Sequence, residues 1–147
     1  MCCKDLQEQY PDEKECFANK TSAEEKGKSF RIQTPKDSNQ TFCRIHVDGC
    51  FVKNDKIRCD YVFIRCSNRE TYYVEFKDTD VTEAYDQIVE TIKTHFLSPK
   101  ERNYGFIIAT RITTSANRII AKKKEEFKKT YGKDLIVKSK AYTHFVK

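Results

Sequence analysis

Two stretches of the sequence decide the fold: Cys59-Asp60-Tyr61-Val62-Phe63-Ile64-Arg65 and Thr71-Tyr72-Tyr73-Val74-Glu75-Phe76-Lys77. Both are rich in β-branched and aromatic residues, which favour strands. The polar residues between them, 67–70, are typical of a turn. The sequence therefore predicts a hairpin of two strands, over residues 57–66 and 71–77, with a few charged side chains on an otherwise apolar surface.

The register of this hairpin predicts where its charged side chains point. With a two-residue turn at 68–69, Asp60 lies opposite Lys77. Because side chains alternate along a strand, Asp60, Glu75 and Lys77 point to one face, with the Cβ atoms of the two acids about 6–8 Å apart. The opposite face is apolar and consists of Tyr61, Phe63, Val74 and Phe76.

The charged face predicts a metal centre. Carboxylate oxygens are ligands that Mg²⁺ and Mn²⁺ prefer, and such cations polarise a phosphodiester and activate water. A neighbouring lysine can position the water or stabilise charge on the phosphate. The alternative interpretation is structural: an Asp60–Lys77 cross-strand ion pair, with Glu75 in solvent.

The segment after the hairpin predicts the clearest helix. Asp80 and Glu83 have the spacing of a capping box. Apolar side chains then recur at helical spacing: Val81, Ala84, Tyr85, Ile88, Val89, Ile92, His95 and Phe96. Further expected elements are a buried strand over 104–110, a helix over 114–131 with Ala116, Ile119, Ile120, Phe127 and Tyr131 inward, and strands at 135–137 and 142–146.

The residues before the hairpin are less regular. Residues 1–21 are expected to be a flexible or weakly helical arm, and residues 22–30 a short helix weakened by Gly27. Residues 42–48 and 50–53 are expected to be extended on either side of Gly49. The element order predicts an α/β fold: one domain over 22–147, with a mixed central sheet and helices on both faces.

Cys59-Asp60, the tripeptide Glu75-Phe76-Lys77 and the acid-capped helix resemble the core of the PD-(D/E)XK nuclease superfamily over residues 40–110. The interval between the aspartate and the glutamate is usual there, although Cys59 stands where proline is common. The resemblance implies a restriction-endonuclease-like αβββαβ core, extended here by a C-terminal helix and strand. It also implies a metal-dependent DNA endonuclease acting as a homodimer, with structure-specific cleavage as one option.

The resemblance implies roles for the hairpin residues. Asp60, Glu75 and the carbonyl of Phe76 would hold Mg²⁺ or Mn²⁺. Lys77 would serve the attacking water. These roles are expectations carried over from the superfamily motif, residue by residue.

Two supporting positions follow from the same resemblance. A further metal ligand on the first core helix would be Glu24 or Glu25, with Glu25 preferred. A glutamine on the helix after the second strand would be Gln87, which lies at the rim of its apolar face. For each of these side chains an exposed surface position is an equal alternative.

The net charge of +6 is unevenly distributed along the chain. Residues 111–147 contain eleven lysines and arginines against three acids, so this segment is +8 and the first 110 residues are −2. A basic segment beside a nearly neutral body is typical of a phosphate-binding surface. We expect DNA contacts from Arg111, Arg118, Lys122, Lys123 and Lys124; the alternative is a solvated helix face.

Other classes of site find less support. The seven cysteines include no CxxC pair and follow no signal-peptide run, so we expect reduced thiols in a cytoplasm and no zinc site. His46, Asp48 and His95 lack the spacing of a histidine-based site. No nucleotide-binding loop and no membrane span are expected. The alternative function is a non-catalytic nucleic-acid-binding or protein-interaction module that retains the nuclease fold.

Overall fold

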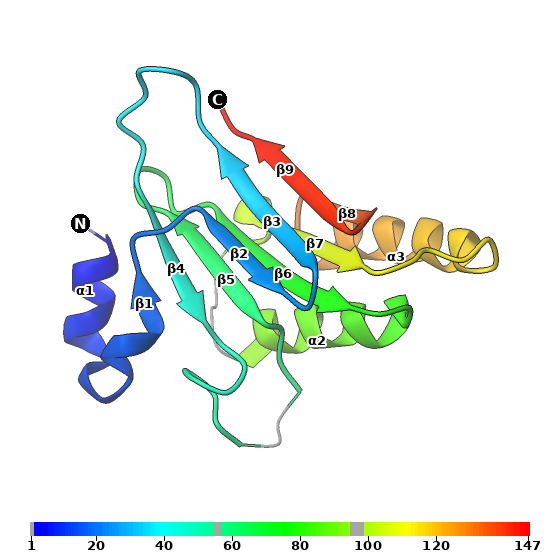
Figure 1. Ribbon diagram of the computed structural model, residues 1–147, viewed down its shortest axis with the longest axis horizontal. Helices are drawn as coiled ribbons and strands as arrows, with labels where there is room; N and C mark the ends of the chain where they lie inside the picture. The colour runs from blue at the N-terminus through cyan, green and yellow to red at the C-terminus, as the bar shows by residue number, and fades with distance from the viewer. Residues whose placement is uncertain (1, 55–56, 95–98) are drawn as a thin grey trace.

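The computed structural model describes residues 2–54, 57–94 and 99–147. A six-stranded sheet forms the centre, and a three-stranded sheet packs on one of its faces (Figure 1). The central sheet has the order β1 (Phe17–Ala18), β4 (Phe42–His46), β5 (Tyr61–Arg65), β6 (Thr71–Lys77), β7 (Asn103–Ala109), β8 (Asp134–Ser139). The smaller sheet has the order β2 (Ser22–Glu25), β3 (Lys28–Gln33), β9 (Ala141–Phe145). The helices are α1 (Cys2–Gln9), α2 (Val81–Thr94) and α3 (Ala116–Thr130), with short 3-10 turns η1 (Pro11–Cys16) and η2 (Lys100–Arg102).

The central sheet is mixed, as predicted. Strands β4, β5 and β6 form an antiparallel meander. Strands β6, β7 and β8 are parallel, and α2 and α3 provide the two connections between them. Parallel neighbours need such crossovers, because a short turn can join only antiparallel strands.

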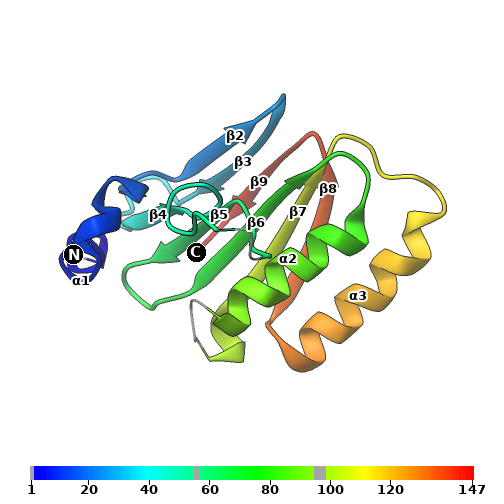
Figure 2. The same ribbon diagram turned by 90° about the horizontal axis from the view of Figure 1, so that it is seen from below.

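The two faces of the central sheet have different coverings (Figure 2). On one face, α2 and α3 pack over a core that includes Tyr73, Ile88 and Ile107. On the other face, the small sheet packs through Phe30 against Phe63 and Phe106, with ring centroids 5.4 and 4.7 Å from that of Phe30. The expectation of helices on both faces is therefore wrong, since a sheet covers the second one.

The difference arises in residues 22–30, which form a hairpin instead of a short helix. Glu25 pairs with Lys28, and the turn residues Lys26 and Gly27 have φ of 48° and 80°. Two central residues at positive φ make the type I′ turn that two-residue hairpins prefer. The glycine that weakened the predicted helix is thus the turn signal.

Two segments that were expected to be extended also differ from the prediction. Strand β5 begins at Tyr61, not at residue 57. Residues 50–53 fold back in a turn, in which the Val52 N–H donates to the Val47 carbonyl at 2.8 Å and Gly49 has φ of 81°. These short local hydrogen bonds replace the ladder that an extended run needs.

The two long helices largely follow the predicted periodicity. In α2 the buried residues include Val81, Ala84, Tyr85, Ile88, Val89 and Ile92, while His95 and Phe96 lie outside the described residues. In α3, Ala116, Ile120 and Phe127 are buried, and Tyr131 just beyond it is partly buried. Ile119 is 42% exposed, so its predicted inward position is wrong. In the described part of the chain, no helix has the length and apolar character to cross a membrane.

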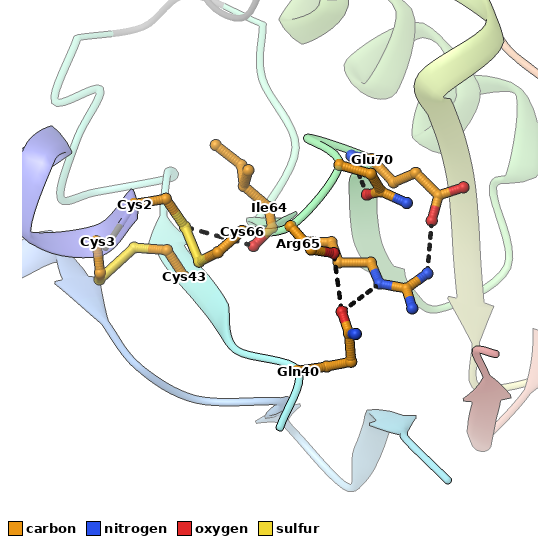
Figure 3. The surroundings of a disulfide bond; sticks show 10 residues. Cys2, Cys3, Gln40, Cys43, Ile64, Arg65, Cys66 and Glu70 are labelled. Atoms are coloured by element: carbon orange, nitrogen blue, oxygen red, sulfur yellow. Dashed lines mark hydrogen bonds and ion pairs between the residues drawn. A yellow bond between two sulfur atoms is a disulfide. The ribbon is translucent and has the colours of Figure 1, made fainter. Parts of the chain in front are cut away.

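Six cysteines form three disulfides: Cys2–Cys66, Cys3–Cys43 and Cys16–Cys50. The first two join α1 to the β5–β6 loop and to β4 (Figure 3). Cys59 remains a buried free thiol. Reduced thiols are thus the wrong expectation for these six side chains. Because disulfides persist in oxidising compartments, they do not support the expected cytoplasmic location.

We predict that loss of one cross-link lowers stability measurably. The double variant Cys16→Ser/Cys50→Ser should lose about 3–4 kcal/mol of unfolding free energy, because its unfolded chain regains the freedom of a 34-residue loop. Urea unfolding measures the loss. Cys59→Ala removes a sulfur but no cross-link, and should cost less. Reaction of seven thiols, instead of one, in the unfolded unreduced protein would contradict the assignment.

Candidate metal centre and catalytic site

The β5–β6 hairpin places the predicted residues together in a register that differs from the expected one. Tyr61 pairs with Val74, and the Arg65 N–H donates to the Glu70 carbonyl at 2.8 Å. The loop therefore has four residues, 66–69, in place of two. Arg69 closes it at φ of 65°. This two-residue shift preserves the faces but moves Asp60 away from Lys77.

Asp60 and Glu75 instead bond to each other's strands. The Asp60 N–H donates to Glu75 Oε1 at 2.9 Å, and the Phe76 N–H donates to Asp60 Oδ2 at 2.9 Å. The N–H and carbonyl of one strand residue point toward the same neighbouring strand. The Phe76 carbonyl therefore faces the side of Asp60, as the metal-ligand prediction requires.

Both carboxyl groups are buried, with residue exposures of 7% for Asp60 and 3% for Glu75. Burial disfavours their charged forms and raises the pKa of Asp60 to about 6 and that of Glu75 to about 10. The charge of Asp60 raises the pKa of Glu75 further. Near neutral pH the pair therefore retains a proton, which a cation between the two carboxyl groups can replace.

Lys77 completes the face, but its partners lie on β6 and α2. Its Nζ is 3.8 Å from Glu75 Oε2, 2.9 Å from Glu83 Oε1 and 3.0 Å from Gln87 Oε1. Burial acts to lower the pKa of Lys77, but the hydrogen bond to Glu83 and the nearby carboxylates outweigh it and raise this pKa. The structure thus brings Gln87 to the site, as predicted. The Asp60–Lys77 ion pair of the alternative interpretation is not formed, because Lys77 contacts Glu75 and Glu83 instead.

Glu83 is the site residue that the sequence reasoning missed. Half of the predicted capping box is present, since the Glu83 N–H donates to Asp80 Oδ1 at 2.9 Å. The Glu83 side chain contacts Lys77 instead of returning to the backbone of Asp80. The spacing of six residues between Lys77 and Glu83, across the start of a helix, has no fixed geometry, so the sequence carries no signal for this contact.

Glu25 also reaches the site, although from a strand and not from a helix. It lines a cleft of about 340 Å³ at the end of β6, formed with Lys26, Lys28 and residues 76–80. Its charge acts to raise the pKa of Asp60. Glu24 is exposed and is not among the residues of the cleft wall.

The donor set suits a hard divalent cation. One oxygen of each buried carboxyl group accepts a backbone N–H, which leaves the second oxygen of Asp60 and of Glu75 for a cation or the shared proton. Paired carboxylates with a carbonyl nearby are typical ligands of Mg²⁺ and Mn²⁺. Glu15, Cys16 and Cys50 also lie within ligand distance of one another, but both sulfurs are in a disulfide.

The predicted basic residues spread away from this centre. Arg111 lies beside it, because its N–H donates to the Asp78 carbonyl at 3.2 Å. Arg118, Lys122 and Lys124 are exposed along α3. Lys123 is partly engaged, with its Nζ 4.8 Å from the Tyr85 ring centroid and 3.7 Å from Glu126 Oε2.

The histidine-based alternative gains no support from the described residues. His46 stacks on Tyr61 with ring centroids 4.8 Å apart. Asp48 pairs with Arg58 at 2.8 Å. His95 lies outside the described ranges.

Comparison with known proteins identifies no relative: no family model matches the chain, and no curated protein or solved structure is significantly similar to it. The geometry of the site is therefore the basis of any functional assignment.

We predict an unusual pH dependence of stability in EDTA. The raised pKa values of Asp60 and Glu75 mean that the native state retains protons which the unfolded chain releases. This stabilisation is complete below the ordinary carboxyl pKa and is lost as the pH rises through the folded values. Unfolding free energy, measured with urea, should fall between about pH 5 and about pH 9.

Glu75→Gln tests the cause directly. It keeps an acceptor for the Asp60 N–H but carries no charge, so at about pH 9 it should be more stable than wild type by about 2 kcal/mol. Glu70→Gln is the opposite control. Despite its partial burial, hydrogen bonds from Asn68 and Arg65 lower the pKa of Glu70, so this variant should lose stability at neutral pH. A Glu75→Gln variant with wild-type pH dependence would contradict the assignment.

Proposed function

We propose that the chain is a metal-dependent nuclease of the PD-(D/E)XK type that hydrolyses phosphodiester bonds in DNA. The observation that carries the proposal is the convergence of Asp60, Glu75 and Lys77. The two acids are buried and exchange backbone hydrogen bonds across the hairpin, with the ammonium group 3.8 Å from Glu75. Such buried acids are costly unless they are protonated or bind a cation.

Each residue of this constellation has a role in that reaction. Asp60, Glu75 and the Phe76 carbonyl would hold Mg²⁺ or Mn²⁺, which would supply positive charge beside the phosphodiester. Lys77 stays protonated and donates a hydrogen bond to the phosphate or the attacking water. Gln87 accepts from the same ammonium group and holds its direction.

The element order also supports the proposal. A meander of β4, β5 and β6, followed by α2 and a parallel β7, has the strand and helix sequence expected of a restriction-endonuclease-like core. The β2–β3 hairpin stands in place of the expected first helix, and it brings Glu25 to the same cleft. We propose Glu25 as an additional metal ligand, directly or through water.

The principal prediction is DNA cleavage in Mg²⁺ or Mn²⁺ that EDTA abolishes. Lys77→Ala should lower the rate by about 100-fold or more, because a donor to the reacting phosphate is lost. The exposed Lys20→Ala is the matched control and should cleave like wild type. Gel assays of linear, nicked, branched and single-stranded DNA, and of RNA, measure the rates and define the substrate.

Metal binding provides a second readout that does not depend on cleavage. Mn²⁺ should raise the melting temperature of wild type, and more so at higher pH because the cation displaces a proton. Glu75→Gln should abolish the shift. Cleavage by Lys77→Ala at the wild-type rate would show that the assigned centre is wrong. Metal binding and DNA binding without cleavage would favour the non-catalytic module.

The basic helix α3 is proposed to bind the phosphate backbone of DNA. The double variant Lys122→Ala/Lys124→Ala should weaken binding and lower the slope of log affinity against log salt by about two, because two phosphate contacts are lost. Fluorescence anisotropy at several salt concentrations measures this slope. An unchanged slope would remove α3 from the interface. The proposal also includes a homodimer, and analytical ultracentrifugation determines whether the chain forms one.

A further inference from the structure

The β2–β3 hairpin is fastened to the ends of two central strands by a buried lysine. Lys28 is 5% exposed, and its Nζ donates to Thr110 Oγ1 at 3.1 Å and to Asp78 Oδ1 at 3.4 Å. Thr110 Oγ1 in turn donates to Asp78 Oδ1 at 3.2 Å. Because Asp78 follows β6 and Thr110 follows β7, these contacts fix the hairpin beside the metal centre.

This anchorage fixes the position of the neighbouring turn. Lys26 is the first residue of the type I′ turn, and its side chain is exposed and lines the cleft with Lys77. Within the described parts of the chain, its ammonium group has no hydrogen bond or ion pair.

The other lysines of the cleft differ from Lys26 in this respect. Lys28 is paired with Asp78, and Lys77 is paired with Glu83. Lys26 is therefore the cleft lysine without an acidic partner among the described residues, and its charge is available to a second phosphate beside the one that Lys77 would contact. Arg111 follows β7, and its backbone N–H donates to the Asp78 carbonyl, so a basic residue stands at the end of β7 as well as on the hairpin.

We propose that Lys26 is a substrate-binding residue, whose ammonium group pairs with a backbone phosphate of a polynucleotide next to the reacting phosphate, which Lys77 and a cation at Asp60 and Glu75 would contact. Lys28 is the positioning residue that holds the turn in place. The polynucleotide then crosses the C-terminal ends of β6 and β7, between the hairpin and Arg111. This inference rests on the proposed nuclease function and adds to it the path of the substrate.

The test uses a substitution that separates charge from folding. Lys26→Asn removes the charge, and asparagine before glycine is the preferred sequence of this turn, so the variant should be at least as stable as wild type. Its KM for a short DNA should rise about tenfold, with kcat within about twofold, because one charge-assisted phosphate contact is lost. The salt slope of binding should fall by about one.

Two further variants serve as controls. Lys26→Arg retains the charge and should stay close to wild type in KM and in salt slope. Lys36→Asn removes an exposed lysine from the loop after β3, at the other end of the hairpin, and should leave both quantities unchanged.

The outcomes distinguish this inference from the proposed function. If wild type cleaves DNA and Lys26→Asn behaves like Lys36→Asn, the role of Lys26 is wrong and the nuclease proposal stands. If wild type does not cleave, the nuclease proposal fails, and anisotropy with a labelled DNA strand decides the rest. Weaker binding by Lys26→Asn would then retain Lys26 as a phosphate-binding residue, whereas equal binding or no binding by wild type would overturn it.

Discussion

The exchange of hydrogen bonds between Asp60 and the end of β6 is the constraint on which the candidate site depends. Each carboxyl group accepts a backbone N–H of the opposite strand, at the point where β5 begins. The two bonds tie Asp60 to the end of β6 and hold the two buried acids together. Because the Phe76 N–H points toward Asp60, the Phe76 carbonyl faces the same side. The same strand pairing therefore sets the positions of all three proposed metal ligands.

This arrangement opposes stability in the absence of a cation. Burial destabilises the charged form of both carboxyl groups, and the charge of Asp60 raises the pKa of Glu75 further. Lys77 offsets part of that cost, but Glu83 and Gln87 also contact its ammonium group. Buried carboxyl groups such as these are concentrated at functional sites. Here they lie at the site that the sequence predicted.

The rest of the molecule keeps this hairpin rigid from several sides. On the helix side, α2 holds Lys77 and packs on β6, while on the other side Phe30 packs against Phe63. At the far end of the hairpin, Arg65 bonds to Glu70 and Cys66 is joined to α1 (Figure 3). Glu75 and Lys77 of the proposed site are therefore carried by a regular strand, which holds side chains more accurately than a loop does, and Asp60 directly precedes another.

Local pattern was sufficient for the strands from β4 to β9, for the shared face of Asp60, Glu75 and Lys77, and for α2 and most of α3. These features depend on side-chain periodicity, which is a property of neighbouring residues in the sequence. A register error of two residues left the faces correct for the same reason, because the strand period is two.

The tertiary structure alone decided the contacts between distant segments. These are the pairing of Asp60 with Glu75, the Glu83 contact of Lys77, the hairpin at Lys26 that covers the second face, and the disulfide partners. Each depends on how closely segments that are distant in the sequence approach each other in space. The Cys2–Cys66 bond, for example, joins residues 64 positions apart. Sequence spacing carries no information on such pairings, since cysteine connectivity and loop geometry are set by packing. The sequence by itself therefore determined which residues share the face of the proposed centre, and the fold determined what each of them touches.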